Sequence, residues 1–444
     1  MGDARRAALT VLERCRRAGA WSDAVLGSVL EREQLEERDR ALATVICYGV
    51  QQNLLLLDYV LQSRSERALN RVEPKILDLL RLSAYQLMFL KKVPASAAVN
   101  EAVKLCRALG YARAAGYVNA VLRRVAAAPS VPTELAGQEA EQLSVRTSHP
   151  RWLVDELLTR LGPKETEALL ECDNAPCPAT LRVNTLRATA AELIASLNSE
   201  GVRAEPHPAL PEDCVIVRAS GDLSATAAFR DGWFFVQDAA AAFSVMAAEP
   251  KNGQRILDLC AAPGGKSFSA AVLSGGEASI ISCDLHPNKL NRIRESASRL
   301  GLTDCIETIA ADGREVRPEW EETFDLVLAD VPCSGLGVIR KKPDVRWKDP
   351  AGFARLPALQ LRLLENAGNC LRPGGTLLYS TCTFREEENA GVVSAFLKGK
   401  GKGIFTPVDF DSPWGTRSEG GILQLWPQRQ GTDGFFIAKL RKQA

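Results

Sequence analysis

The chain has 444 residues, of which 46% are hydrophobic and 25% charged, and 55 basic against 54 acidic residues give a formal net charge of +1. A prior of roughly 150 residues per domain predicts two to four domains with an ordinary core, and any basic surface for nucleic acid has to be local. The chain has no run of 18 apolar residues, no apolar leader after Met1 and no disulfide-scaffold spacing among its 12 cysteines. We therefore expect a cytoplasmic protein without a membrane anchor. With three histidines and a lone C-x4-C pair, we expect no metal site.

The first half of the chain changes character twice. Residues 1–126 are predicted to form a helix bundle, because apolar residues recur at intervals of three and four. Residues 127–148 are small, polar and proline-containing, which is typical of a linker, here with some helix in it. Residues 149–235 are predicted to form a small α+β domain. Its expected helices are 153–161, 165–172 and 190–198, and its expected strands are 179–183, 215–217 and 233–236.

Residues 236–444 alternate between strand and helix patterns, which predicts a parallel sheet with helices on both faces. The fold class is thus multidomain: an all-α bundle, a small α+β domain and a Rossmann-like α/β domain. The expected strands are 256–259, 279–283, 306–310, 324–329, 375–380 and, last, 434–440. The expected helices are 238–248, 265–273, 289–300, 359–371 and 386–397.

A glycine turn follows the first of these strands. Glycines let a backbone approach a ligand closely, and the next helix offers free N–H groups to a carboxylate. A dinucleotide site would need G-x-G-x-x-G, which is missing, and a phosphate-binding P-loop would need a glycine where Cys260 stands. The third candidate is a site for S-adenosylmethionine. The turn that would hold its methionine part is Cys260-Ala261-Ala262-Pro263-Gly264-Gly265-Lys266.

Acidic residues at the following strand ends favour the third candidate. Asp284 comes about 20 residues after Gly265, where an acid can bind both hydroxyls of a ribose. Asp312 follows the third strand and is placed to meet the adenine amino edge. Asp330 follows the fourth strand, so that three acids stand at successive strand ends.

Two cysteines also follow predicted strands. Cys333 stands after 324–329 and Cys382 after 375–380. The carboxyl ends of parallel strands line the crevice where ligands bind, so we expect these thiols to take part in nucleophilic chemistry rather than to fill the core. Asp330 is placed to hold a substrate base, and Lys266 could lower the pKa of a thiol. The spacing does not decide which cysteine attacks.

A basic loop follows Cys333. Cations neutralise phosphates and an aromatic ring can stack on a base, so we expect this loop to contact RNA. The alternative is a solvated charged loop. The residues concerned are Arg340, Lys341, Lys342, Arg346 and Trp347.

Together these segments resemble the RNA cytosine-C5 methyltransferases of the Nop/Sun group. Residues 258–266 resemble the family's first motif, 330–335 its proline-cysteine motif and 380–383 its threonine-cysteine motif. Residues 81–87 and 94–103 resemble the NusB-type RNA-binding bundle. A bundle of that type ahead of this catalytic domain is similar to the bacterial members that methylate small-subunit rRNA.

The resemblance implies a function and roles for the residues above. It implies methyl transfer from S-adenosylmethionine to C5 of a cytosine in 16S rRNA, free or in an assembly intermediate, by a monomer that needs no membrane. Cys382 would be the nucleophile that adds to C6, and Cys333 would assist elimination. Residues 260–266, Asp284, Asp312 and Asp330 would contact the cofactor or its edge of the site. The alternatives are another RNA cytosine target, an RNA-binding or antitermination factor with an inactive second domain, and a P-loop-like ATPase.

Overall fold

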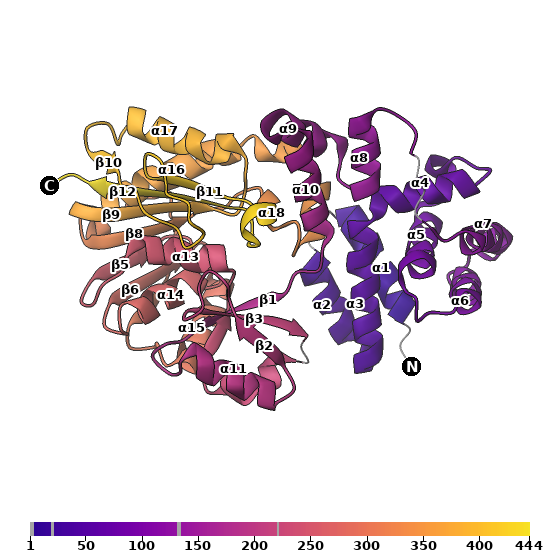
Figure 1. The fold of residues 1–444 in the computed structure, drawn as a ribbon, viewed down its shortest axis with the longest axis horizontal. Helices are drawn as coiled ribbons and strands as arrows, with labels where there is room; N and C mark the ends of the chain where they lie inside the picture. The colour runs from indigo at the N-terminus through magenta and orange to yellow at the C-terminus, as the bar shows by residue number, and fades with distance from the viewer. Residues whose placement is uncertain (1–3, 19–21, 131–134, 220–221) are drawn as a thin grey trace. The chain divides into compact units, whose positions relative to one another are not determined.

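The computed structural model describes residues 4–18, 22–130, 135–219 and 222–444, and residues 131–134 of the expected linker lie outside that description. The chain divides into two compact units (Figure 1). Unit 1 comprises Met1–Ala175 and Ile339–Lys348, and unit 2 comprises Pro176–Val338 and Asp349–Ala444.

Unit 1 is built of helices, as predicted for its first part. One stripe of each helix packs into a shared core that includes Val11, Ile46, Leu57, Leu79 and Val121. The first seven α-helices are α1 (Ala4–Ala18), α2 (Ser22–Glu33), α3 (Glu37–Gln52), α4 (Leu54–Arg64), α5 (Pro74–Phe89), α6 (Ala95–Ala108) and α7 (Ala115–Ala127).

Three further helices also belong to unit 1: α8 (Glu139–Thr147), α9 (Arg151–Leu161) and α10 (Pro163–Asn174). The expected linker contains α8, in line with the helix expected within it, and the compact unit continues to Ala175. Buried contacts explain why the unit includes α8. Leu143 of α8 is in the core, and the Leu56 N–H of α4 donates to Ser148 Oγ at 3.1 Å, directly after α8.

Unit 2 begins with an antiparallel sheet of order β2-β3-β1-β4. Leu181, Val215 and Phe234 of the sheet share a buried cluster with Leu193 and Leu197 of the helix that covers it. Strand β2 was not predicted, because it is short and offers one buried residue. The elements are β1 (Ala179–Val183), α11 (Ala190–Ser199), β2 (Arg203–Pro206), β3 (Cys214–Ala219), α12 (Ala227–Arg230) and β4 (Phe234–Val236).

The larger sheet of unit 2 has eight strands in the order β10-β12-β9-β8-β5-β6-β7, with β11 paired to β12. Strands β5 to β9 are parallel, as predicted, whereas β10, β11 and β12 join antiparallel. The sheet is therefore mixed. Its strands are β5 (Arg255–Asp258), β6 (Ser279–Asp284), β7 (Ile306–Ala310), β8 (Phe324–Asp330), β9 (Leu371–Thr381), β10 (Phe405–Pro407), β11 (Ile422–Leu425) and β12 (Phe435–Lys442).

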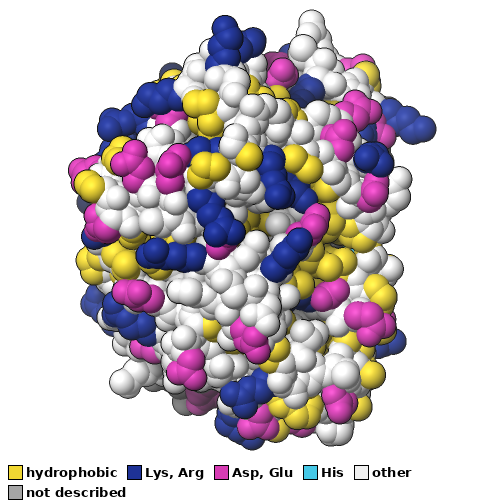
Figure 2. Space-filling model, turned by 90° about the vertical axis from the view of Figure 1, so that its left-hand side faces the viewer, with side chains coloured by type: hydrophobic (Ala, Val, Ile, Leu, Met, Phe, Trp, Pro, Cys, Tyr) yellow, Lys and Arg dark blue, Asp and Glu magenta, His cyan; other side chains and the backbone are white. Residues whose placement is uncertain are grey.

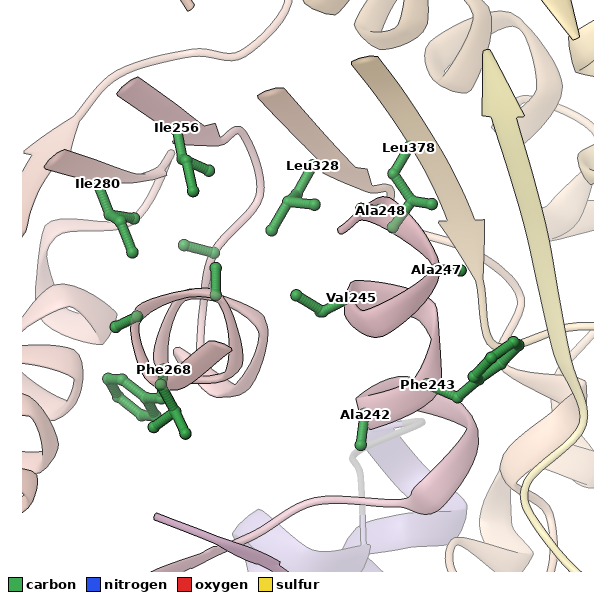
Figure 3. Packing of buried hydrophobic residues seen from close by; sticks show 14 of the residues in the cluster. Ala242, Phe243, Val245, Ala247, Ala248, Ile256, Phe268, Ile280, Leu328 and Leu378 are labelled. Atoms are coloured by element: carbon green, nitrogen blue, oxygen red, sulfur yellow. The ribbon is translucent and has the colours of Figure 1, made fainter. Parts of the chain in front are cut away.

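Helices cover both faces of this sheet, because successive strand side chains point to opposite sides. Leu326 and Leu328 pack with the helices of one face, and Val327 and Ala329 with those of the other. In Figure 3 buried side chains of four neighbouring strands point towards α13 and α14. The first face carries α13 (Ala239–Ala248), α14 (Gly265–Leu273) and α15 (Pro287–Leu300), and the second α16 (Leu356–Cys370) and α17 (Ala390–Lys398).

The strand order of the larger sheet indicates where a ligand can bind. The chain order reverses between β5 and β8, and such a switch point is where open α/β sheets bind ligands.

On the face drawn in Figure 2, Lys and Arg side chains are interspersed with acidic ones. Within the described ranges no single helix is long and apolar enough to cross a bilayer, although the bent pair α3–α4 passes by length and composition.

Candidate active site

A pocket of about 150 Å³ lies at the carboxyl ends of β5 and β8, the switch point of the sheet. Most of the predicted glycine turn lines it. Gly264 takes a left-handed φ of 109°, and a Cβ there would lie 2.5 Å from the Phe268 ring, so only glycine fits. The lining residues are Val236, Gln237, Ala241, Asp258, Cys260, Ala261, Ala262, Pro263, Gly265, Lys266 and Asp330.

Asp258, at the end of β5, is a pocket residue that the sequence did not single out. It is fully buried, and its Oδ2 accepts a hydrogen bond from Ser267 Oγ at 2.7 Å. Its Oδ1 has no hydrogen-bond partner among the described residues. Burial raises the pKa of this carboxyl to about 7, against the lowering effects of the Ser267 bond and the Lys266 charge. Because Asp258 lines the pocket, its carboxyl acts on the charge of any ligand group bound there.

The other two predicted cofactor acids lie at the ends of the next strands. Asp284 Oδ1 accepts from the His286 N–H at 2.9 Å and lies 3.9 Å from Lys289 Nζ. Arg314 Nε contacts both oxygens of Asp312, at 2.8 and 2.9 Å. The Arg314 hydrogen bonds lower the pKa of the Asp312 carboxyl to about 2. Neither acid lines the pocket described above, so the structure places both at the predicted sheet edge but outside that pocket.

Lys266 and Asp330 form an ion pair in the pocket wall. Lys266 Nζ lies 2.7 Å from Asp330 Oδ2, and Ser380 Oγ donates to Asp330 Oδ1 at 2.9 Å. Lys266 Nζ also lies 5.0 Å from the centre of the Phe435 ring. Residues of β8, β9 and α14 thus meet at one carboxylate, which is held from two sides, and Phe435 of β12 contacts the lysine of the pair.

The two predicted cysteines lie together at this end of the sheet. Cys333 Sγ is 3.2 Å from Cys382 Sγ, and both residues are partly exposed. The hydrogen bond with Cys382 raises the pKa of the Cys333 thiol well above its ordinary value, and burial and the charges of Glu388 and Asp330 act in the same direction. Cys333 therefore keeps its proton at neutral pH.

Glu388 is a second residue that the sequence did not single out. It is buried, and its Oε2 accepts from the Ser334 N–H at 2.8 Å and from Gln360 Nε2 at 3.0 Å. The acidic run 386–388 is visible in the sequence, but only the third acid is buried. Its contact with the loop of Cys333 spans a long stretch of chain, which periodicity cannot reveal.

The basic loop has a different role from the expected one at two of its five positions. Arg346 is fully buried within unit 1, where its Nη1 donates to Asn174 Oδ1 at 2.9 Å and to the Ser148 carbonyl at 3.2 Å. Burial lowers the pKa of its guanidinium to about 10. The indole N–H of Trp347 donates to the Gln51 carbonyl at 2.9 Å. These two side chains anchor the loop in unit 1, which corrects the expectation that Arg346 faces RNA.

The remaining three positions of the loop keep some exposure. Arg340 Nε donates to the Ala175 carbonyl at 3.4 Å and is half-buried. Lys341 is half-buried and Lys342 is exposed. Arg340, Lys341 and Lys342 thus stay predicted RNA contacts.

Comparisons with known proteins agree with this architecture. Residues 245–441 match the family model described as 16S rRNA methyltransferase RsmB/F, residues 2–127 match the NusB family, and residues 149–223 match the ferredoxin-like domain of RsmF/B-like methyltransferases. The chain is 38% identical to the probable ribosomal RNA small subunit methyltransferase B of Bacillus subtilis, over 98% of each chain. It is 35% identical to ribosomal RNA small subunit methyltransferase B of Vibrio cholerae, over 93% of this chain and 92% of the other. The crystal structure of PH0851 matches 99% of this chain and 98% of its own, with a TM-score of 0.82 and 27% identity.

Proposed function

Because the chain belongs to the RsmB/F family of 16S rRNA methyltransferases, we propose that it transfers a methyl group from S-adenosylmethionine to C5 of a cytosine in 16S rRNA. The observation that carries the proposal is the pair of thiols at the ends of neighbouring strands, Cys333 Sγ and Cys382 Sγ, 3.2 Å apart. C5 of cytosine is a poor nucleophile on its own. A thiolate that adds to C6 activates it, which is why this substrate needs a cysteine.

The pocket residues fit S-adenosylmethionine. The carboxyl of Asp258, in the lining of the pocket, suits the positive charge of the ammonium of its methionine part, and the glycine turn lets the backbone approach the ligand. Asp284 would take the ribose hydroxyls and Asp312 the adenine edge. When bound, the cofactor supplies a methyl group carried on a positively charged sulfur. A triphosphate fits less well, because the carboxyls of Asp258 and Asp330 line the same pocket and would repel it.

The residues divide the covalent steps between them. The Cys382 thiolate forms a bond from Sγ to C6, and the electron pair of the C5–C6 double bond moves towards C5 and the N3 edge. Asp330, held by Lys266 and Ser380, is placed to bind that edge. Once C5 carries the methyl group, its proton passes to water. The electron pair of that C5–H bond forms the C5–C6 double bond as the C6–S bond breaks, and the electron pair of the C6–S bond returns to Sγ of Cys382.

The thiol of Cys333 suits the last of these steps. Its raised pKa keeps it protonated, which suits a proton donor. At 3.2 Å it can donate its proton to the departing sulfur of Cys382 and regain one from solvent. This supports Cys333 as the residue that assists release, and the assignment of Cys382 as the nucleophile rests on the resemblance of 380–383 to the family's threonine-cysteine motif.

Two substitutions test the assignment. Cys333→Ala should let attack proceed and block release, so that a covalent RNA–protein adduct accumulates and is seen as a shifted band on a denaturing gel. Cys382→Ala should give neither adduct nor product. The parent chain should incorporate tritiated methyl groups into undermethylated 16S rRNA, and bisulfite mapping should place them on a cytosine. An adduct with Cys382→Ala alone would reverse the roles, and no incorporation by the parent chain would refute the proposal.

A further inference from the structure

The loop that carries Cys333 is held by the buried carboxylate of Glu388. One oxygen, Oε2, accepts from the Ser334 N–H, next to the cysteine, at 2.8 Å and from Gln360 Nε2 at 3.0 Å. Gln360 Nε2 also donates to the Pro332 carbonyl at 2.9 Å, so both neighbours of Cys333 are tied to one polar cluster. The second oxygen, Oε1, is buried without a hydrogen-bond partner among the described residues. A buried oxygen without a partner costs stability, and here that cost falls on the residue that holds the Cys333 loop.

The turn that carries Cys382 is held by Asn389, the residue directly after Glu388. Asn389 Oδ1 accepts from Thr381 Oγ1 at 2.6 Å, and its Nδ2 donates to the Thr383 carbonyl at 2.9 Å. Both contacts flank the cysteine. Asn389 is buried, and its Nδ2 also donates to Gln424 Oε1 at 3.1 Å. Its side chain therefore fixes the turn from both sides of the reactive residue.

Further hydrogen bonds connect Glu388 to strand β9 and connect the loop of Cys333 to the turn of Cys382. Tyr379 Oη, on β9, donates to the Glu388 carbonyl at 2.6 Å. Ser334 Oγ lies 2.8 Å from Thr383 Oγ1, and the Gly337 N–H donates to the Cys382 carbonyl at 2.9 Å. A short stretch of chain that ends in Glu388 and Asn389 thus contacts both cysteine loops.

We infer that Glu388 and Asn389 are positioning residues that set the two thiols against each other, Glu388 through the Cys333 loop and Asn389 through the Cys382 turn. The inference rests on the proposed function, because it assigns the two residues to different steps of that reaction. Glu388 serves release, since it holds the thiol that protonates the departing sulfur. Asn389 serves attack, since it holds the nucleophile.

The experiment separates formation of the adduct from its release. Each variant is mixed with S-adenosylmethionine and undermethylated 16S rRNA, and the adduct is followed over time on a denaturing gel beside parent and Cys333→Ala. With Glu388→Ala we expect the adduct to form at close to the parent rate but to persist about tenfold longer, because the Ser334 N–H of the Cys333 loop loses its buried acceptor. With Asn389→Ala we expect formation to slow by about tenfold and little adduct to accumulate.

Conservative and control variants separate a positioning role from a general loss of folding. Glu388→Gln retains an acceptor for the Ser334 N–H, so its adduct should persist for a time between parent and Glu388→Ala. If Glu388→Ala does not fold, as judged by its melting temperature, Glu388→Gln alone decides, and release at the parent rate overturns the assignment of Glu388. Asn389→Ser and Asn389→Asp are the corresponding conservative variants for Asn389. If they fold and form the adduct at the parent rate, the assignment of Asn389 is overturned. Glu386→Gln, on the exposed first position of the same acidic run, should behave as the parent.

The outcomes distinguish this inference from the proposal on which it rests. If Cys333→Ala traps no adduct on RNA that the parent methylates, the covalent mechanism itself fails. If Cys333→Ala traps the adduct while every Glu388 variant releases it at the parent rate, only the role of Glu388 is overturned. An adduct trapped equally by Glu388→Ala and Asn389→Ala would show that the two residues do not act on separate steps.

Discussion

The pKa of Asp258 predicts how cofactor binding depends on pH. Burial raises the pKa of this carboxyl from 3.8 to about 7. If this carboxyl attracts the ammonium of S-adenosylmethionine, binding requires the ionised form. The ionised fraction rises from about 3% at pH 5.5 to about a half at pH 7, so Kd should fall about fifteenfold over that interval. Stability changes in the opposite sense: the protonated carboxyl stabilises the folded state below about pH 4, and this contribution is lost as pH rises through about 7.

Isothermal titration calorimetry with S-adenosylmethionine at several pH values measures the effect. Asp258→Asn should bind more weakly and should lose most of the pH dependence, because it has no carboxyl to ionise. His286→Gln controls for the imidazole beside Asp284 and should keep the parent slope. A Kd that is the same at pH 5.5 and 7 in the parent chain, or an undiminished slope in Asp258→Asn, would refute the reasoning.

Three other substitutions test the ion pair and the basic loop. Lys266→Met should reduce methyl incorporation about a hundredfold, measured as single-turnover rate, since Asp330 loses the cation that holds it at the substrate edge. Arg346→Met should lower the free energy of unfolding by about 3 kcal/mol in urea titrations, because buried oxygens of Ser148 and Asn174 lose their donor. Lys342→Met, at an exposed position, should leave stability unchanged but reduce the salt dependence of rRNA binding by about one phosphate contact.

The sequence predicted best those elements whose apolar runs are buried. The strands at 179–183 and 306–310 and the helix at 265–273 have the predicted bounds. Strand β10, by contrast, is three residues long with one buried side chain, so it carries no pattern to recognise. The expected helix over 386–397 is a 3-10 turn at Glu386–Glu388 followed by α17, because Asn389 breaks it with φ −112° and ψ −104°. On either side of that break, the Glu388 side chain contacts the loop of Cys333 and the Asn389 side chain contacts the turn of Cys382.

The sequence predicts the site residues whose place in the fold is set by their position at the end of a strand. Cys333, Cys382 and Asp330 follow buried strands, and parallel strands end at one edge, so their proximity could be expected. Asp258 and Glu388 were missed because their importance comes from burial and from partners distant in sequence, such as Ser334 for Glu388. No local pattern reports such a partner.

The basic loop shows why composition misled at Arg346. A cation in a charged loop is usually solvated, yet a guanidinium has five donors and can satisfy buried carbonyls. Pro343 and Val345 are buried beside it, and the whole segment 339–348 belongs to unit 1. This segment directly follows the Cys333 loop, whose Gly337 leaves no room for a Cβ beside the Gly434 carbonyl. A cut after Ala175 would therefore separate Arg346 from Ser148 and Asn174, its partners within unit 1.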